Sequence, residues 1–109
     1  MSKRAELLPG TLDLLILQTL ARGPHHGYGI ALSIKRASDE VLTVEEGSLY
    51  PALQRLLLQG AVKAEWRKTD TNRRARYYTL TAAGRKQLGI ERSEFDQVIA
   101  AIGRVLEST

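Results

Sequence analysis

The length, composition and charge of the chain are those of a small folded protein. It has 109 residues, of which 43% are hydrophobic and 26% charged, so a single core is expected and a disordered chain is excluded. The absence of cysteine excludes disulfides and thiolate zinc sites, and the formal net charge of +4 is weak evidence for a polyanionic partner. The first eight residues have no signal-peptide pattern, and the apolar stretch over residues 12–20 is too short to cross a bilayer. A cytoplasmic protein without membrane contact is therefore expected.

Three helices are predicted in the first part of the chain. Residues 11–21 are apolar nearly all round, which indicates a helix buried on more than one side. Helical spacing of apolar side chains predicts a shorter second helix over residues 27–38. A third helix is predicted from residue 45 or 46 to residue 59, ended by Gly60, which adopts a left-handed conformation without steric cost. The core-facing stripe of this third helix is predicted to be Leu49, Leu53, Leu56 and Leu57.

After the third helix the hydrophobic period changes from 3.6 to 2. Residues 62–67 alternate between apolar and charged side chains, which is typical of a strand with one buried face. Residues 69–72 have the composition of a turn, and residues 76–80 form a second predicted strand. Together they predict a β-hairpin with a basic tip. Trp66, the only tryptophan, is expected to pack into the core.

The last predicted element is a long helix that begins after an N-cap at Thr81 and runs to Leu106. A helix of about 26 residues is roughly 39 Å long, more than a core of this size can cover. Its apolar stripe is therefore expected to form a homodimer, with folding back onto its own domain as the alternative. Five of the predicted dimerisation residues follow heptad spacing, broken at Glu91: Leu88, Phe95, Val98, Ile102 and Val105. The other two, Ile99 and Leu106, widen this apolar stripe.

The predicted fold class is mainly α with a small β-hairpin. Two helices joined by a short connection and followed by a hairpin are typical of the winged helix-turn-helix, in which the second helix of the pair enters the major groove of DNA. Residues 1–80 are predicted to form this winged helix-turn-helix domain, and residues 81–109 a C-terminal dimerisation helix.

All the surplus positive charge lies in the central third of the chain. Residues 46–80 hold seven basic and three acidic side chains, whereas charges balance on either side. Such a concentration is typical of a surface that neutralises phosphates, although a solvated face is the alternative. The seven basic residues are Arg55, Lys63, Arg67, Lys68, Arg73, Arg74 and Arg76.

Three motifs in the chain resemble the signature of one family. The first, L…GPxHGYxI, is similar to Leu20, Gly23, Pro24, His26, Gly27, Tyr28 and Ile30. The second, G(S/T)LYPAL, resembles residues 47–53 and continues at Leu56, Gly60 and Val62. The third, RxYYxLTxxG, resembles Arg76, Tyr77, Tyr78, Leu80, Thr81, Gly84 and Leu88. Over residues 7–88 the chain thus resembles the PadR-type transcriptional regulators.

This resemblance implies a winged-helix homodimer that binds double-stranded DNA at a palindromic operator and represses. Arg55 and Gln54 of the reading helix are expected to bond guanine and adenine edges in the major groove. Ser48 and Tyr50 are expected to bind phosphates, and the wing arginines to contact the backbone or minor groove. Tyr28 either bonds a phosphate or packs at the turn. The implied DNA-binding residues are Tyr28, Ser48, Tyr50, Gln54, Arg55, Arg73, Arg74 and Arg76.

The chain departs from the family in two places. Glu45 and Glu46 stand where many members have Ser-Pro, and their carboxylates suit a helix N-terminus but repel phosphates. The C-terminal helix lacks a tryptophan, so the drug-stacking pocket of some relatives is not carried over. Some family members release DNA on binding a small molecule, and the sequence leaves such an effector open.

Other functions have less support. No nucleophile and base, glycine-rich phosphate loop or cofactor motif is recognisable, so an enzyme is not expected. His25 and His26 are adjacent on a turn, where neighbours rarely share a metal, and no metal site is expected. The remaining alternative is a winged helix that binds proteins and not DNA.

Overall fold

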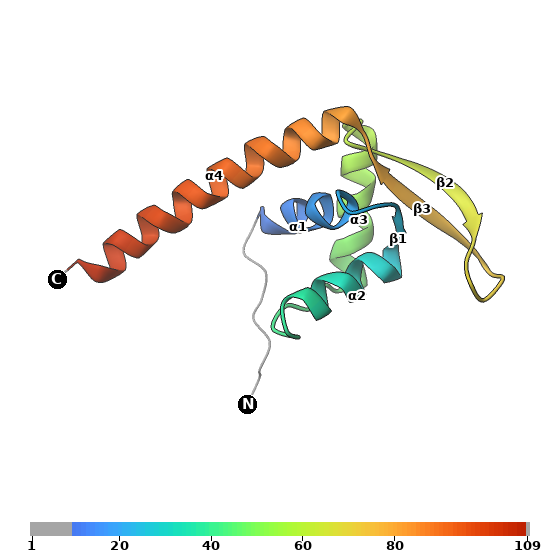
Figure 1. Cartoon of the computed structure of the whole chain (residues 1–109), viewed down its shortest axis with the longest axis horizontal. Coiled ribbons are helices and arrows are strands. Elements are labelled where there is room, and N and C mark those ends of the chain that lie inside the picture. Colours follow the sequence, from blue (N-terminus) through green and yellow to red (C-terminus); the bar gives the residue numbers. More distant parts are fainter. Residues whose placement is uncertain (1–9, 109) are drawn as a thin grey trace.

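Three short helices form a body from which a β-hairpin and a long helix extend in different directions (Figure 1). The computed structural model describes residues 10–108. The prediction that the first eight residues have no signal-peptide pattern concerns a segment outside the described residues. The elements in chain order are α1 (Thr11–Leu20), β1 (His25–His26), α2 (Gly27–Ala37), α3 (Glu46–Leu58), β2 (Val62–Lys68), β3 (Arg74–Leu80) and α4 (Ala82–Glu107). The predicted mainly α fold with a wing and a C-terminal helix is therefore confirmed.

Local hydrogen bonds explain where the helices begin and end. The backbone N–H of Gly29 donates to Nδ1 of His26 at 3.0 Å, so a histidine caps the start of α2. The predicted cap of α4 is also present, because Gly84 N–H donates to the Thr81 hydroxyl at 3.0 Å. Gly60 follows α3 with a φ of 77°, the left-handed conformation expected of it.

The sheet has three strands and not the two that the sequence predicted. Its order is β1-β3-β2, all antiparallel, with His25 opposite Tyr78 and His26 opposite Tyr77. Strand β1 has two residues, too few for an alternating pattern to be visible in the sequence. Strand β3 begins at Arg74, two residues before the predicted start, because its pairing with β2 continues to Lys68.

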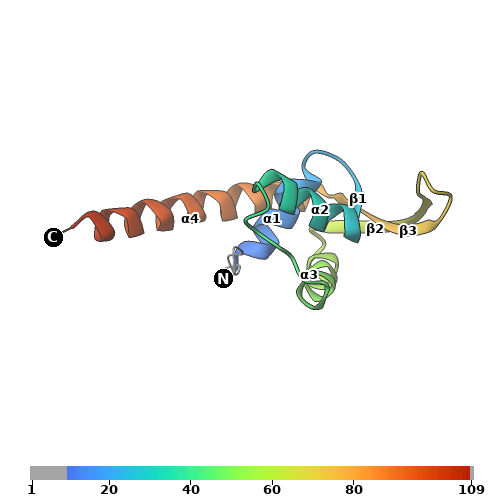
Figure 2. The same ribbon diagram turned by 90° about the horizontal axis from the view of Figure 1, so that it is seen from below.

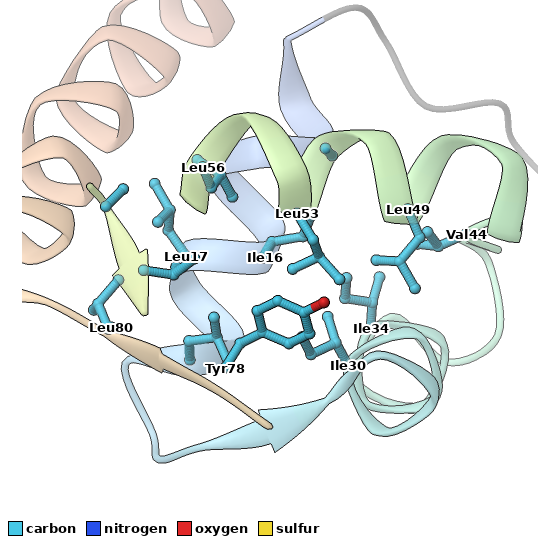
Figure 3. Packing of buried hydrophobic residues seen from close by; sticks show 14 residues of the cluster. Ile16, Leu17, Ile30, Ile34, Val44, Leu49, Leu53, Leu56, Tyr78 and Leu80 are labelled. Carbon is cyan, nitrogen blue, oxygen red and sulfur yellow. The ribbon is translucent and has the colours of Figure 1, made fainter. Parts of the chain in front are cut away.

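The core lies between α1, α2, α3 and the base of the sheet. Leu49, Leu53 and Leu56 of α3 are buried, which confirms most of the stripe predicted for that helix. Figure 3 shows Leu53 next to the ring of Tyr78 from β3, and Leu49 beside Val44 and near Ile34. Helix α1 is buried along its second half, as its apolar sequence indicated. The buried residues of α1 are Ile16, Leu17 and Leu20.

Trp66 does not pack in the core as predicted, because 60% of its surface is exposed. The alternation of β2 is real: Val62 is buried and Ala64 packs against the edge of the core. Beyond Ala64, however, the hairpin extends past the body, so the same face of the strand has nothing to cover it (Figure 2). The prediction was wrong because alternation along a strand indicates which residues share a face, but not how far the body covers that face.

Helix α4 packs on the body through its first turns, where it contacts β3, and it also contacts α1. A Cβ placed on Gly84 would lie 2.0 Å from the carbonyl oxygen of Ala61, so the helix backbone rests directly on the chain after α3. Leu88, one of the predicted dimerisation residues, is partly buried against the core of its own chain. The rest of the helix runs past α1 and extends away from the hairpin to the C-terminus (Figure 1). None of the helices within residues 10–108 is long and apolar enough to span a membrane.

Candidate nucleic-acid interface

The exposed side of α3 lies next to the start of α2. The ring of Tyr50 lies so close to Gly27 that a Cβ there would be 2.9 Å from the tyrosine Cε1 and hydroxyl atoms. Tyr50 is nevertheless 47% exposed, and Tyr28, one residue along α2, is 69% exposed. Packing at the turn uses Gly27 against Tyr50, and the exposed ring of Tyr28 lies parallel to the His26 ring, with 6.4 Å between the centroids.

A groove connects these two tyrosines with the wing. It has a volume of about 420 Å³ and is lined by Gly27, Tyr28, Tyr50, Trp66 and Arg76, among others. Side chains from α2, α3 and the hairpin thus line one continuous depression. In Figure 2, α3 is seen nearly end-on and projects from the body beside the hairpin, so the helix and the wing are both open to one partner.

The two faces of the wing carry different charges. In the antiparallel register, Trp66 lies opposite Arg76 and Lys68 opposite Arg74. Residues directly opposite each other point to the same side of a sheet, so these four side chains share one face, here called the Trp66 face. This face is continuous with buried Val62 and therefore belongs to the side of the sheet that packs on the body. Its outer part carries three cations and no carboxylate.

The opposite side of the wing, here called the Tyr77 face, carries Lys63, Glu65, Arg67 and Tyr77. The Arg67 Nε donates to Glu65 at 3.0 Å, and the same pair makes a second, shorter contact through Nη2. The hydrogen bond from Arg67 and then its charge lower the pKa of the Glu65 carboxyl below its usual range. One cation of this face is therefore already paired, and the unpaired positive charge of the strands lies mainly on the Trp66 face.

Aromatic rings hold the arginines of the Trp66 face. The Arg74 guanidinium carbon lies 5.3 Å from the centroid of the Trp66 ring, and that of Arg76 lies 5.9 Å from the Tyr78 centroid. Such cation–π contacts favour a defined position of the guanidinium group. Two of the three wing arginines predicted to bind DNA are therefore positioned side by side.

Arg73, the third predicted wing residue, lies in the turn and not in a strand. The turn is closed by the Thr69 N–H, which donates to the Arg73 carbonyl at 2.6 Å, and by Asn72 with a φ of 64°. The side chain of Arg73 is exposed at the tip. The predicted trio is thus divided between the Trp66 face and the tip.

The four predicted residues of α3 form two rows on its exposed half. Tyr50 and Gln54 are four residues apart and share the side toward α2, where Tyr50 contacts Gly27. Ser48 and Arg55 are seven residues apart and share the side toward α1. There the Arg55 guanidinium donates to the Asp13 carboxylate at 3.0 Å. The sequence did not predict this ion pair, because its partners are 42 residues apart.

Both acidic residues that depart from the family pattern lie at the start of α3. Glu45 is the N-cap residue without a side-chain capping bond, and Glu46 is in the first turn. Both are exposed. Their charges complement the positive end of the helix dipole, so the positive potential of this side of the molecule comes from the wing and not from the tip of α3.

The adjacent histidines serve the turn before α2. His26 uses Nδ1 for the helix cap, and the His25 ring fits directly over Gly29, where an added Cβ would lie 2.1 Å from the ring. Burial, and then the nearby His26, lower the pKa of His25 below its usual value. No group of three or more potential metal ligands occurs among the described residues.

A second open surface lies along α4. The exposed apolar side chains of Phe95, Val98, Ile99 and Ile102 border a groove of about 530 Å³ between α1 and α4. Asp13, Glu91 and Glu94 stand at its edge. Six of the seven predicted dimerisation residues are exposed, and Leu88 is the exception. The exposed members are Phe95, Val98, Ile99, Ile102, Val105 and Leu106.

A compact three-helix body, a wing beside the third helix and a long C-terminal helix define the winged helix-turn-helix class of transcriptional regulators. Within that class the chain belongs to the PadR-like family of transcriptional regulators, whose family model matches residues 16–90.

Solved structures agree with this assignment. A transcriptional regulator from Clostridium thermocellum is 30% identical with a TM-score of 0.80, over 87% of this chain and 92% of that one. A PadR family transcription regulator from Clostridium difficile is 27% identical with a TM-score of 0.76, over 89% of this chain and 99% of that one. A 37.1 kDa protein in a transposon of Streptomyces fradiae is 41% identical over 88% of this chain, which spans 25% of that protein.

Proposed function

We propose that the chain is a sequence-specific DNA-binding repressor that binds a palindromic operator as a homodimer. The observation that carries the proposal is the Trp66 face, which has three cations and no carboxylate on its outer part and whose Trp66 and Arg76 line the groove that α3 also borders. When a phosphate backbone enters this groove, its counterions are released, and this release increases the affinity of the protein for DNA. A role on DNA also implies a cytoplasmic location.

In this proposal α3 enters the major groove and the wing contacts the neighbouring backbone. Gln54 lies on the side of α3 toward α2 and can bond an adenine edge. Arg55 can bond a guanine edge once its ion pair with Asp13 is broken. An exposed ion pair of this kind contributes about 0 to 1 kcal/mol, so phosphate or base contacts can replace it. The residues proposed to hold the DNA backbone are Tyr28, Ser48, Tyr50, Arg73, Arg74 and Arg76.

The proposed dimer forms through α4. Residues 1–80 then act as the DNA-binding domain and residues 81–109 as the dimerisation helix. The exposed stripe of α4 supports this division, because an isolated helix is marginally stable in water and apolar side chains gain about 25 cal/mol for each Å² that they bury. A small-molecule effector, which some family members use, would act by changing the spacing of the two reading helices.

The first test compares the two wing faces in binding to generic duplex DNA over a range of salt concentrations. The double variant Arg74→Gln, Arg76→Gln should reduce the slope of log affinity against log salt by about 2, since each phosphate contact contributes about 0.9. The matched variant Lys63→Gln, Arg67→Gln removes the same charge from the Tyr77 face and should change the slope less. Equal effects would contradict the proposed orientation. A wild-type protein that binds no duplex at low salt would favour a protein-binding winged helix.

A further inference from the structure

Trp66 is an exposed aromatic side chain of the wing that neither the core nor the predicted DNA contacts explain. Its side chain is 60% exposed, and both adjacent residues of the strand are charged. A single exposed hydrophobic residue is common on protein surfaces and needs no function. Trp66, however, lines the same groove as two other exposed rings, those of Tyr28 and Tyr50. Apolar surface is therefore concentrated where the proposed ligand would enter.

The immediate surroundings of the indole are cationic. Arg74 lies over its ring at 5.3 Å, and Arg76 is its direct partner across the two strands. The indole has a single polar atom, an N–H that donates and cannot accept. The indole and the side chains of its two arginine neighbours thus offer donors and an apolar surface, and no acceptor. This combination suits a phosphate next to the apolar face of a sugar, which is the repeating unit of a nucleic-acid backbone.

We propose that Trp66 is itself a DNA-contacting residue. Together with Arg74 and Arg76 it forms a wing site for one sugar–phosphate unit, in which the indole covers the deoxyribose and the N–H donates to a phosphate oxygen. This inference rests on the proposed function and adds a contact to it. It also explains why an aromatic ring stands at a position where the strand has left the body.

The first experiment uses Trp66 as its own reporter, because it is the only tryptophan in the chain. Acrylamide quenching of the intrinsic fluorescence is measured without and with a saturating duplex of about 25 base pairs, and binding is followed separately by anisotropy of a labelled duplex. We expect the quenching constant to fall at least twofold on saturation. Unchanged quenching with a bound duplex would overturn the inference. A duplex that does not bind would instead contradict the proposed function.

The second experiment separates contact with DNA from support of Arg74. Trp66→Ala should weaken duplex binding roughly tenfold, the size of one good contact, and Trp66→Phe, which keeps a ring but loses the N–H, should weaken it less. The two Trp66 variants are measured again in a protein that also carries Arg74→Gln. If Trp66 only positions Arg74, Trp66→Ala has no effect on duplex binding in the Arg74→Gln protein, and the inference fails. A thermal melt confirms that each variant is folded.

Discussion

The body and the outer part of α4 distribute their side chains in opposite ways. In the body, large apolar residues such as Ile16 and Leu53 are buried, and the charged residues are outside. Along the outer α4 the apolar residues are outside, and Leu106 is 78% exposed. The body therefore buries most of its large apolar side chains within one chain, whereas the outer part of α4 leaves its apolar side chains exposed. In the proposed function, DNA binding and subunit pairing are therefore assigned to separate parts of the chain.

The largest expected effect follows from placing charge on the apolar stripe of α4. Val98→Glu with Ile102→Glu should weaken self-association at least roughly 100-fold, because each carboxylate would be buried without a partner in the interface. Sedimentation velocity over a concentration series measures the effect. Ser93→Glu with Gln97→Glu adds the same charge to the opposite side of the helix and should leave association nearly unchanged. Equal behaviour of the two variants would break the comparison between the regions.

The junction between the two regions is expected to be intolerant of a single methyl group. Gly84→Ala should destabilise the fold by about 1 to 3 kcal/mol, since the new Cβ would meet the Ala61 carbonyl. Chemical denaturation measures the change. Gly89→Ala is the matched control: nothing lies within 4 Å of its added Cβ, and alanine favours a helix interior over glycine by about 0.5 to 1 kcal/mol. If Gly84→Ala is as stable as Gly89→Ala, α4 is not held at this point.

A smaller loss is expected from removing the cap of α2. His26→Ala deletes the acceptor for the Gly29 N–H and should cost about 1 kcal/mol of stability. His26→Asn retains an acceptor at a typical N-cap and should recover most of it. Urea denaturation of the two variants at pH 8 decides the point. Equal losses would indicate that the ring, which packs edge-on against Tyr77 at 5.2 Å, matters more than its nitrogen.

The smallest effect concerns pH and again lies in the body. Burial lowers the pKa of His25, so the folded state binds fewer protons than the unfolded state. The contribution of His25 is thus fully present above its unfolded pKa, about 6.5, and is lost as the pH falls through the folded pKa. Unfolding free energies should decrease between pH 8 and 5 more steeply in the wild type than in His25→Gln. Identical pH profiles would show that the partly buried ring has no such effect.

The parts of the fold that depend on local pattern could be predicted from the sequence. The stripe of α3, the stop at Gly60 and the Thr81 cap each follow from spacing or from one residue type, and all three are present. Features that depend on distant partners could not be predicted. Strand β1 exists only because β3 lies beside it, and the burial of Trp66 was misjudged because alternation does not indicate where a body ends.

The candidate site shows the same limit. The sequence predicted the wing arginines as one group, but strand register separates Arg74 and Arg76, on the Trp66 face, from Arg73 in the turn. The sequence also predicted that Arg55 bonds a guanine edge, but it did not predict that the fold brings Asp13 next to this side chain. The surplus of basic residues over residues 46–80 predicted the region of the candidate site. The register of β2 and β3 was needed to identify which face of the wing carries the unpaired charge.

Selection of bound duplexes from a random library tests the central claim most directly, because a twofold dimer that reads DNA must select a symmetric sequence. The account predicts enrichment of inverted half-sites whose centres lie about one helical turn, roughly 34 Å, apart. Enrichment of isolated, asymmetric half-sites, or of no sequence at all by a protein that sediments as a monomer, would contradict it.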